Sequence, residues 1–85
     1  MAYEIIPLAL KKIARRRIPM EWVEQTLESP DQIVEGYESR QVAQKRYCEG
    51  DREVLLRIVF EGEGDRQIVV TAYVTSRIER YWRPE

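Results

Sequence analysis

The sequence predicts an α+β domain with two N-terminal helices packed on one face of a three- to four-stranded antiparallel sheet. Two observations support this fold class. Before about residue 38 apolar residues recur every three or four positions, and after it they alternate with polar ones. A chain of 85 residues, 44% of them hydrophobic, has room for one core, so we expect a single domain over 1–85.

The first helix is expected over about 7–17. Pro7 suits a first helical turn, where its missing N–H costs nothing, and Pro19 disfavours helical geometry at Ile18. Its apolar stripe consists of Ile6, Leu10, Ile13 and Ala14. A second helix is expected over about 19–28, because apolar side chains share one face and Ser29-Pro30 then stops the helix.

Three strands are expected over about 41–47, 53–61 and 67–76, because these segments are rich in Val, Ile, Tyr and Phe and are separated by short glycine-bearing breaks. A short edge strand at Ile33-Val34 is a further option. The all-apolar face of the central strand is expected to contact the helices, which leaves the other face more open. The apolar set is Val54, Leu56, Ile58 and Phe60, and the open face carries Arg57, Thr71 and Tyr73.

Several classes of site are excluded by what the chain lacks. Histidine is absent, which rules out serine–histidine and cysteine–histidine hydrolases and removes the commonest metal ligand. Cys48 is the only cysteine, and its acidic neighbours disfavour a reactive thiolate. We therefore expect no metal and no cofactor. No apolar run is long enough to cross a bilayer and the start lacks the features of a signal peptide, so a cytoplasmic protein without a membrane partner is expected.

Charge is concentrated in the helical half, although the whole chain has a formal charge of −1. Five basic residues occupy seven positions from Lys11 to Arg17, and six acids with no base follow between Glu21 and Glu38. One interpretation is phosphate contact by the basic face. The other is a solvated helix face that the acids of the second helix balance. The candidate RNA-binding residues are Lys12, Arg15, Arg16 and, on the first long strand, Arg46.

Polar residues on the strands supply the candidate catalytic set, namely Arg57, Tyr73 and Lys45. Arginine stabilises charge developing on a phosphate, and a lysine or tyrosine transfers a proton when its pKa is lowered. A ribonuclease without histidine and without metal needs such a set. The alternative is that these residues form the wet face of a half-buried sheet.

The order of elements and several sequence stretches resemble a bacterial family catalogued as domain of unknown function 4258, from about Pro7 to Trp82. The matching stretches are Ala9, Lys12, Ile13, Arg16 and Ile18, then Val23, Leu27, Ser29-Pro30-Asp31 and Ile33, and finally Val69 to Tyr73, Thr75 to Ile78 and Tyr81-Trp82. The family is similar to small RelE-like and barnase-like toxins. This resemblance implies that the open sheet face holds RNA, that an antitoxin protein covers it, and that Arg16, Arg57 and Tyr73 carry the site.

The chain departs from the family pattern at two positions of the first helix. Leu8 stands where family members often carry a histidine, and Lys12 stands where an arginine is typical. Lysine is the weaker phosphate ligand of the two, because it lacks the bidentate fork of arginine. Leu8 either removes a catalytic group or replaces a structural one by simple packing, and the sequence leaves both options open.

Two functions follow as expectations. The first is a toxin-like domain that binds or cleaves RNA without metal and pairs with an antitoxin. The second is a non-catalytic protein-interaction module on the same scaffold, which fits the near-neutral charge and the exposed-looking aromatics Tyr37, Tyr81 and Trp82. Homodimerisation through a sheet edge is compatible with either.

Overall fold

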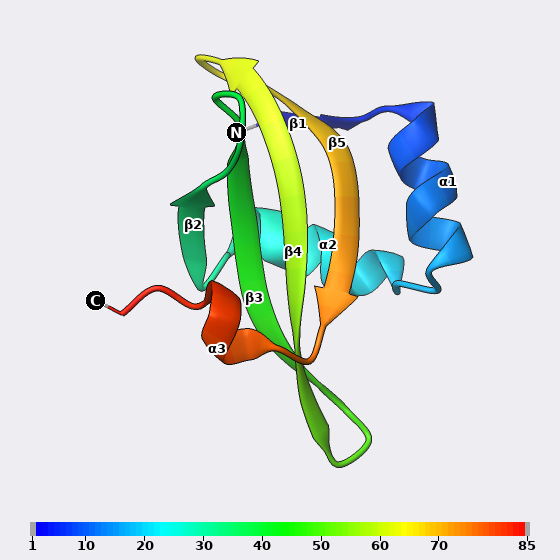
Figure 1. Ribbon diagram of the computed structural model, residues 1–85. Coiled ribbons are helices and arrows are strands. Elements are labelled where there is room, and N and C mark those ends of the chain that lie inside the picture. The colour runs from blue at the N-terminus through cyan, green and yellow to red at the C-terminus, as the bar shows by residue number, and fades with distance from the viewer. Residues whose placement is uncertain (1, 85) are drawn as a thin grey trace.

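Within residues 2–84, which the computed structural model describes, five strands form one sheet with two helices on one face and a short helix on the other (Figure 1). The strand order across the sheet is β1-β5-β4-β3-β2. No helix of these residues is both long and apolar enough to span a membrane. The elements are β1 (Ala2–Ile5), α1 (Pro7–Arg15), α2 (Met20–Glu28), β2 (Gln32–Glu35), β3 (Gln41–Glu49), β4 (Arg52–Glu63), β5 (Arg66–Thr75) and α3 (Ile78–Tyr81).

The α+β class and the two N-terminal helices are confirmed, whereas the purely antiparallel sheet of three to four strands is wrong. β1 adds a fifth strand and pairs in parallel with β5, with Tyr3 opposite Gln67 and Ile5 opposite Val69. The four residues of β1 are too few to show a clear alternation of apolar and polar side chains. This strand is therefore recognised only from its pairing with β5. The optional edge strand at Ile33-Val34 is present as β2, which pairs antiparallel with β3.

Helix α1 ends two residues earlier than expected, because hydrogen bonds from Arg17 and Ile18 terminate it ahead of Pro19. Arg17 has a positive φ of 55°, and its N–H donates to the carbonyl of Ala14 at 3.0 Å. The N–H of Ile18 donates to the carbonyl of Ile13, also at 3.0 Å. This pair of bonds is the Schellman ending of a helix, with the two isoleucines supplying the hydrophobic contact that accompanies it.

The core lies between the sheet and helices α1 and α2. We call this side of the sheet the helix face; its buried residues are Ala9, Ile13, Ile18, Val23, Ala43, Leu56, Ile58, Phe60, Val69 and Ala72. The expected inward position of Leu56, Ile58 and Phe60 is thus confirmed. The opposite side, which carries Arg57, we call the open face.

A register shift between β4 and β5 changes which residues of β5 face the helices. Val59 pairs with Thr71 and Phe60 pairs with Val69, so Val70 is an extra residue in β5. Such a bulge reverses the alternation of side chains beyond it. Val69, rather than Val70, therefore joins the helix-face core, while Thr71 and Tyr73 stay beside Arg57 on the open face.

Candidate functional site

The open face of the sheet holds a groove of about 770 Å³. Strands β4 and β5 form its floor, the β2–β3 connection forms one side, and α3 with the residues after it forms the other. Its lining residues are Glu35, Gly36, Tyr37, Arg40, Val42, Arg57, Val59, Thr71, Tyr73, Arg80, Tyr81 and Arg83. Four of these are arginines and three are tyrosines, a combination suited to an anionic ligand with aromatic groups.

Arg57 lies at the centre of the groove floor. It pairs with Gln44 on β3 and with Tyr73 on β5, so the three side chains form a row across the open face. Its Nε donates to Oε1 of Gln44 at 3.0 Å, and its Nη1 donates to the hydroxyl of Tyr73. The guanidinium also lies 4.1 Å from the ring centroid of Tyr81.

All of these contacts of Arg57 are with neutral groups. Among the side chains that the structure describes, no carboxylate pairs with Arg57 and none accepts a hydrogen bond from its Nη2 group. A guanidinium has five N–H donors in a fixed fork, and its charge does not titrate near neutral pH. Arg57 is therefore oriented by the fold and retains both charge and donors for a ligand in the groove.

Gln44 on β3 fixes the position of the Arg57 guanidinium, and it was not among the site residues predicted from the sequence. Its side chain is 0% exposed. Besides accepting from Arg57, it donates through Nε2 to Oε1 of Gln32 at 2.8 Å and to the carbonyl of Tyr81 at 3.1 Å. The signal available in the sequence was an uncharged polar residue directly after the apolar pair Val42-Ala43 in a predicted strand. If such an amide is buried, both of its ends need hydrogen-bond partners.

The chain after β5 folds onto the open face. Gln32 and Arg83 exchange two hydrogen bonds, one from the Gln32 amide to the Arg83 carbonyl and one from the Arg83 N–H to Oε1 of Gln32. The guanidinium of Arg46 lies 4.0 Å from the ring centroid of Trp82. Tyr81 and Trp82 are consequently half-buried, contrary to their exposed-looking pattern, whereas Tyr37 is 91% exposed as expected.

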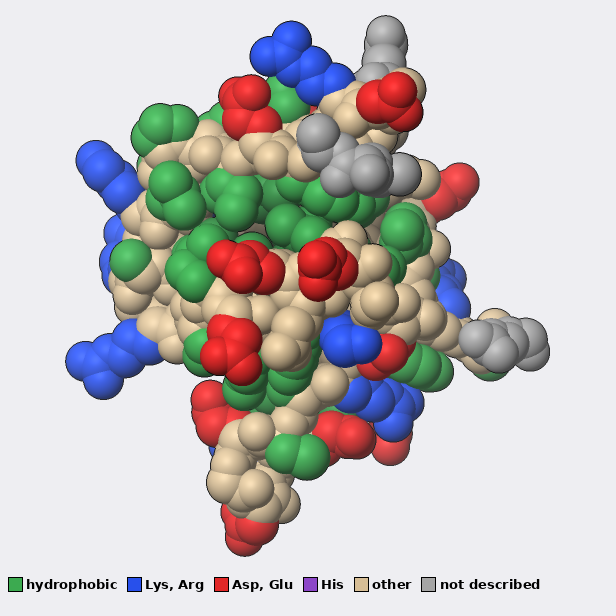
Figure 2. All heavy atoms as spheres, turned by 180° about the vertical axis from the view of Figure 1, so that it is seen from behind, with side chains coloured by type: hydrophobic (Ala, Val, Ile, Leu, Met, Phe, Trp, Pro, Cys, Tyr) green, Lys and Arg blue, Asp and Glu red, His purple; other side chains and the backbone are tan. Residues whose placement is uncertain are grey.

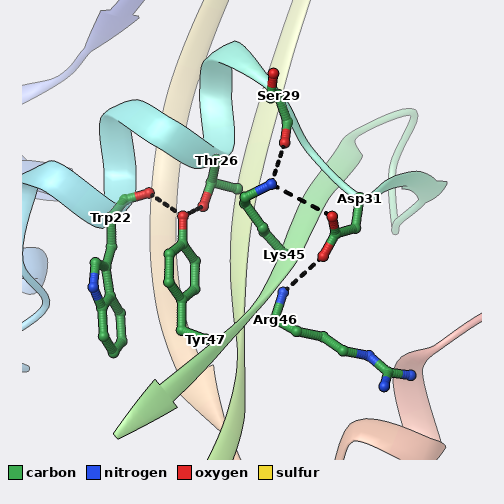
Figure 3. A network of polar contacts seen from close by, with 7 residues as sticks. All are labelled: Trp22, Thr26, Ser29, Asp31, Lys45, Arg46 and Tyr47. Carbon is green, nitrogen blue, oxygen red and sulfur yellow. Dashed lines mark hydrogen bonds and ion pairs between the residues drawn. The ribbon is translucent and has the colours of Figure 1, made fainter.

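Lys45 does not join Arg57 and Tyr73, although all three were expected in one set. It pairs with Leu56 of β4, which places it on the helix face. Its Nζ donates to the carbonyl of Ser29 at 2.8 Å and lies 3.4 Å from Oδ1 of Asp31 (Figure 3). Neighbouring residues of a strand point to opposite faces, so the one-residue step from Gln44 to Lys45 separates the two environments.

The surroundings of Lys45 hold α2 against β3. The hydroxyl of Tyr47 donates to the carbonyl of Trp22 at 3.0 Å and lies 2.9 Å from the hydroxyl of Thr26 (Figure 3). The rings of Trp22 and Tyr47 stack with centroids 4.4 Å apart. The Lys45 contact satisfies the carbonyl of Ser29, the C-cap residue of α2, whereas the Tyr47 bonds hold the side of the helix against β3. We assign Lys45 a structural role.

The expected RNA-binding residues are distributed over several sites. Arg16 does not line the groove but contacts one residue that does: its Nη1 donates to the carbonyl of Ala72 at 2.7 Å and to the hydroxyl of Thr71 at 3.3 Å. Lys12 and Arg15 lie on α1 and do not line the groove. Arg46 lines a separate hollow beside Glu53, with which it forms an ion pair at 3.5 Å.

Leu8 and the side chains that could bind a metal ion complete the description of the predicted site residues. Leu8, for which the family resemblance implied a histidine position, is 55% exposed and outside the groove lining, so it neither packs nor faces Arg57. No group of three or more carboxylate, thiol or imidazole side chains suited to a metal ion occurs among the residues that the structure describes. The polar groups that line the groove are mainly those of arginine and tyrosine, together with the carboxylate of Glu35 and the hydroxyl of Thr71.

Comparison with protein families places this sheet and its helices in a known group. A family model described as "Domain of unknown function (DUF4258)" matches residues 9–74. The chain belongs to this family. No curated protein and no solved structure gives a significant match. The residues matched to the DUF4258 family include Gln44, Arg57 and Tyr73, whereas the segment that supplies Arg80, Tyr81 and Arg83 follows the matched region.

Proposed function

We propose that the protein binds single-stranded RNA in the open-face groove, with Arg57 holding a backbone phosphate. The observation that carries this proposal is the guanidinium of Arg57, fixed by neutral partners and facing the groove with unused donors. Arginine binds phosphate through two parallel N–H groups, and a fork that is already oriented loses little entropy on binding.

The rest of the groove fits the other parts of an RNA strand. Arg80 and Arg83 lie on the side formed by α3 and the following residues, where they supply positive charge for adjacent phosphates. Tyr37 on the β2–β3 connection is almost fully exposed and offers a face on which an unstacked base packs. Arg40, in contrast, is paired with Glu61 at 3.1 Å and contributes less free charge.

Cleavage is the further activity that the toxin resemblance implies, and in our proposal Tyr73 assists it. Because the Tyr73 hydroxyl accepts a hydrogen bond from Arg57, its own proton remains available to a ligand. In this scheme the 2′-oxygen bonds to phosphorus and gives its proton to water, while the bond to the 5′-oxygen breaks and Tyr73 protonates that oxygen. Lys45 has no part in it.

The test of binding is fluorescence anisotropy with a labelled single-stranded RNA, comparing the wild type with Arg57→Ala. We expect the substitution to raise the Kd by about 10- to 100-fold, because a charge-assisted hydrogen bond contributes about 1.5–3 kcal/mol. Arg52→Ala, at the exposed β3–β4 hairpin, is the matched control and should leave the Kd unchanged. Equal affinity of Arg57→Ala and wild type, with both folded by circular dichroism, would refute the assignment.

Cleavage is tested separately by inducing expression in a bacterial host and scoring growth and RNA integrity. Tyr73→Phe keeps the ring and removes the hydroxyl, so it should retain RNA binding while abolishing any cleavage and growth arrest. RNA degradation that persists in Tyr73→Phe would remove Tyr73 from the mechanism but leave the binding groove intact.

A protein-interaction module is the second candidate, and the exposed Tyr37 favours it. Tyrosine and arginine are the residues that most often anchor protein interfaces. This alternative predicts that RNA does not bind at all and that Tyr37→Ala weakens capture of a partner protein encoded beside this chain. Saturable RNA binding that Arg57→Ala removes would decide against it.

A further inference from the structure

The outer surface of helices α1 and α2 carries two rows of opposite charge. Ala9 and Ile13 of α1 face the sheet, so by helical periodicity Lys11 and Arg15 project from the other side of that helix; we call these two the basic ridge. Val23 and Thr26 of α2 face the sheet in the same way. The exposed carboxylates on the outer side of α2, which we call the acidic ridge, are Glu21, Glu24 and Glu28.

The two ridges do not neutralise each other within the chain. The ion pairs among residues 2–84 are Arg40–Glu61, Lys45–Asp31, Arg46–Glu53 and Arg66–Glu4, and none of them joins α1 to α2. The expectation that the acids of the second helix balance the bases of the first is therefore not met by direct pairing. Both ridges keep their charge for an external partner.

The same two helices also expose apolar side chains. Leu10 of α1 is 44% exposed and Met20 at the start of α2 is 41% exposed, while Ile6 and Leu27 are only partly buried against the core. Figure 2, which looks onto this side of the molecule, shows hydrophobic side chains gathered around a hollow with acidic side chains along its border. Contiguous apolar surface with a charged rim is characteristic of a protein interface.

We propose that a second copy of this chain covers the outer surface of α1 and α2 in a two-fold dimer. The basic ridge of each protomer then lies against the acidic ridge of the other. A two-fold interface must be self-complementary, and a surface with one basic and one acidic half meets that condition when the axis runs between the halves. The net charge of −1 gives no general repulsion between copies. The groove with Arg57 lies on the opposite face and stays open in this dimer.

Sedimentation equilibrium over a concentration series, at low and high salt, is the first measurement. We expect a monomer–dimer equilibrium that weakens as salt is added, because exposed charges are screened. A chain that remains monomeric at every concentration, whether or not it binds another protein, would overturn the proposal.

Two charge-reversed variants then test the register of the ridges. Lys11→Glu/Arg15→Glu makes both ridges acidic, and Glu21→Lys/Glu24→Lys/Glu28→Lys makes both basic. Each variant alone should have its dimer Kd raised at least about tenfold, since every substitution acts twice across a two-fold axis. An equimolar mixture of the two should restore association, because an all-acidic face then meets an all-basic one.

The control for net charge is Arg52→Glu/Arg77→Glu, two exposed positions outside α1 and α2 whose reversal changes the charge by the same amount as the first variant. It should dimerise like the wild type. Dimers that survive in both ridge variants would place the contact elsewhere, for instance at a sheet edge, and would contradict the proposed interface. Failure of the mixture to associate would contradict the pairing of the ridges.

Discussion

The two faces of the sheet treat their basic residues differently, and Lys45 and Arg57 show how. Lys45 on the helix face contacts a carboxylate and a helix-terminal carbonyl, so its charge is used within the fold. Arg57 on the open face is bound by a glutamine, a tyrosine hydroxyl and an aromatic ring, all of them neutral. A side chain that is oriented but not neutralised is available to a ligand. The comparison therefore separates a cation that is neutralised within the fold from one whose contacts leave its charge unpaired.

The faces also differ in what stabilises them. Burial of apolar side chains such as Leu56 and Ile58 holds the helices on one side. On the other side a hydrogen-bonded network through Gln32 and Gln44 fastens the C-terminal segment. A polar network tolerates the loss of a member poorly, because each buried group left without a partner costs free energy.

The largest effect is expected from breaking the open-face network with Gln44→Leu. This change leaves Nε of Arg57 and the carbonyl of Tyr81 without their partner and removes one of the two hydrogen bonds that Oε1 of Gln32 accepts, so it should lower the free energy of unfolding by about 2–4 kcal/mol. Urea denaturation measures the difference. Gln41→Leu, at an exposed position of the same strand, is the control and should change stability by less than about 0.5 kcal/mol. A Gln44→Leu variant as stable as the control would show that the network contributes little.

A smaller effect on stability is expected from Lys45→Met, which sharpens the contrast with Arg57. The ion pair with Asp31 is partly exposed, so its loss together with the bond to Ser29 should cost at most about 1 kcal/mol. RNA affinity should stay at the wild-type value in the same anisotropy assay. A tenfold weaker Kd in Lys45→Met would mean that the helix face also takes part in RNA binding.

The smallest effect concerns Tyr3, whose ring packs edge-on against Phe60 at 5.6 Å and reports the apolar character of the helix face. Desolvation by burial raises the pKa of the Tyr3 hydroxyl above its ordinary value. The unfolded chain then loses this proton at lower pH than the folded one, so stability should fall as the pH rises beyond about 10. Tyr3→Phe should flatten that alkaline decline in denaturant unfolding. If the stability of wild type and Tyr3→Phe depended on pH in the same way, the raised pKa of Tyr3 would be contradicted.

Much of the helix face could be predicted from local pattern. The spacing of Ile13 with its neighbours and the alternation through Leu56, Ile58 and Phe60 predict which side chains meet, because both periods are properties of a few consecutive residues. The same alternation correctly predicts that Arg57, Thr71 and Tyr73 face the other way. The alternation fails on the N-terminal side of Thr71, where the extra residue Val70 reverses the pattern and no glycine or proline in the sequence signals the change.

The candidate site was predictable only in part. Arg57 and Tyr73 were identified because arginine and tyrosine stand out on an apolar strand, and Lys45 was included because charge alone does not reveal which face a residue occupies. Gln44 was missed because an amide carries no charge. Its importance comes from having partners at both ends of the side chain, and these lie on three different elements.

The sequence by itself determined the order of the later elements, the apolar face of the central strand and the exclusion of histidine chemistry. These conclusions depend on composition or on residues a few positions apart. Only the tertiary structure decided that β1 pairs in parallel with β5, that Tyr81 lies over Arg57, and that Gln32 binds Arg83, 51 positions away. Contacts of that range reflect how separate elements pack, and no local period encodes them.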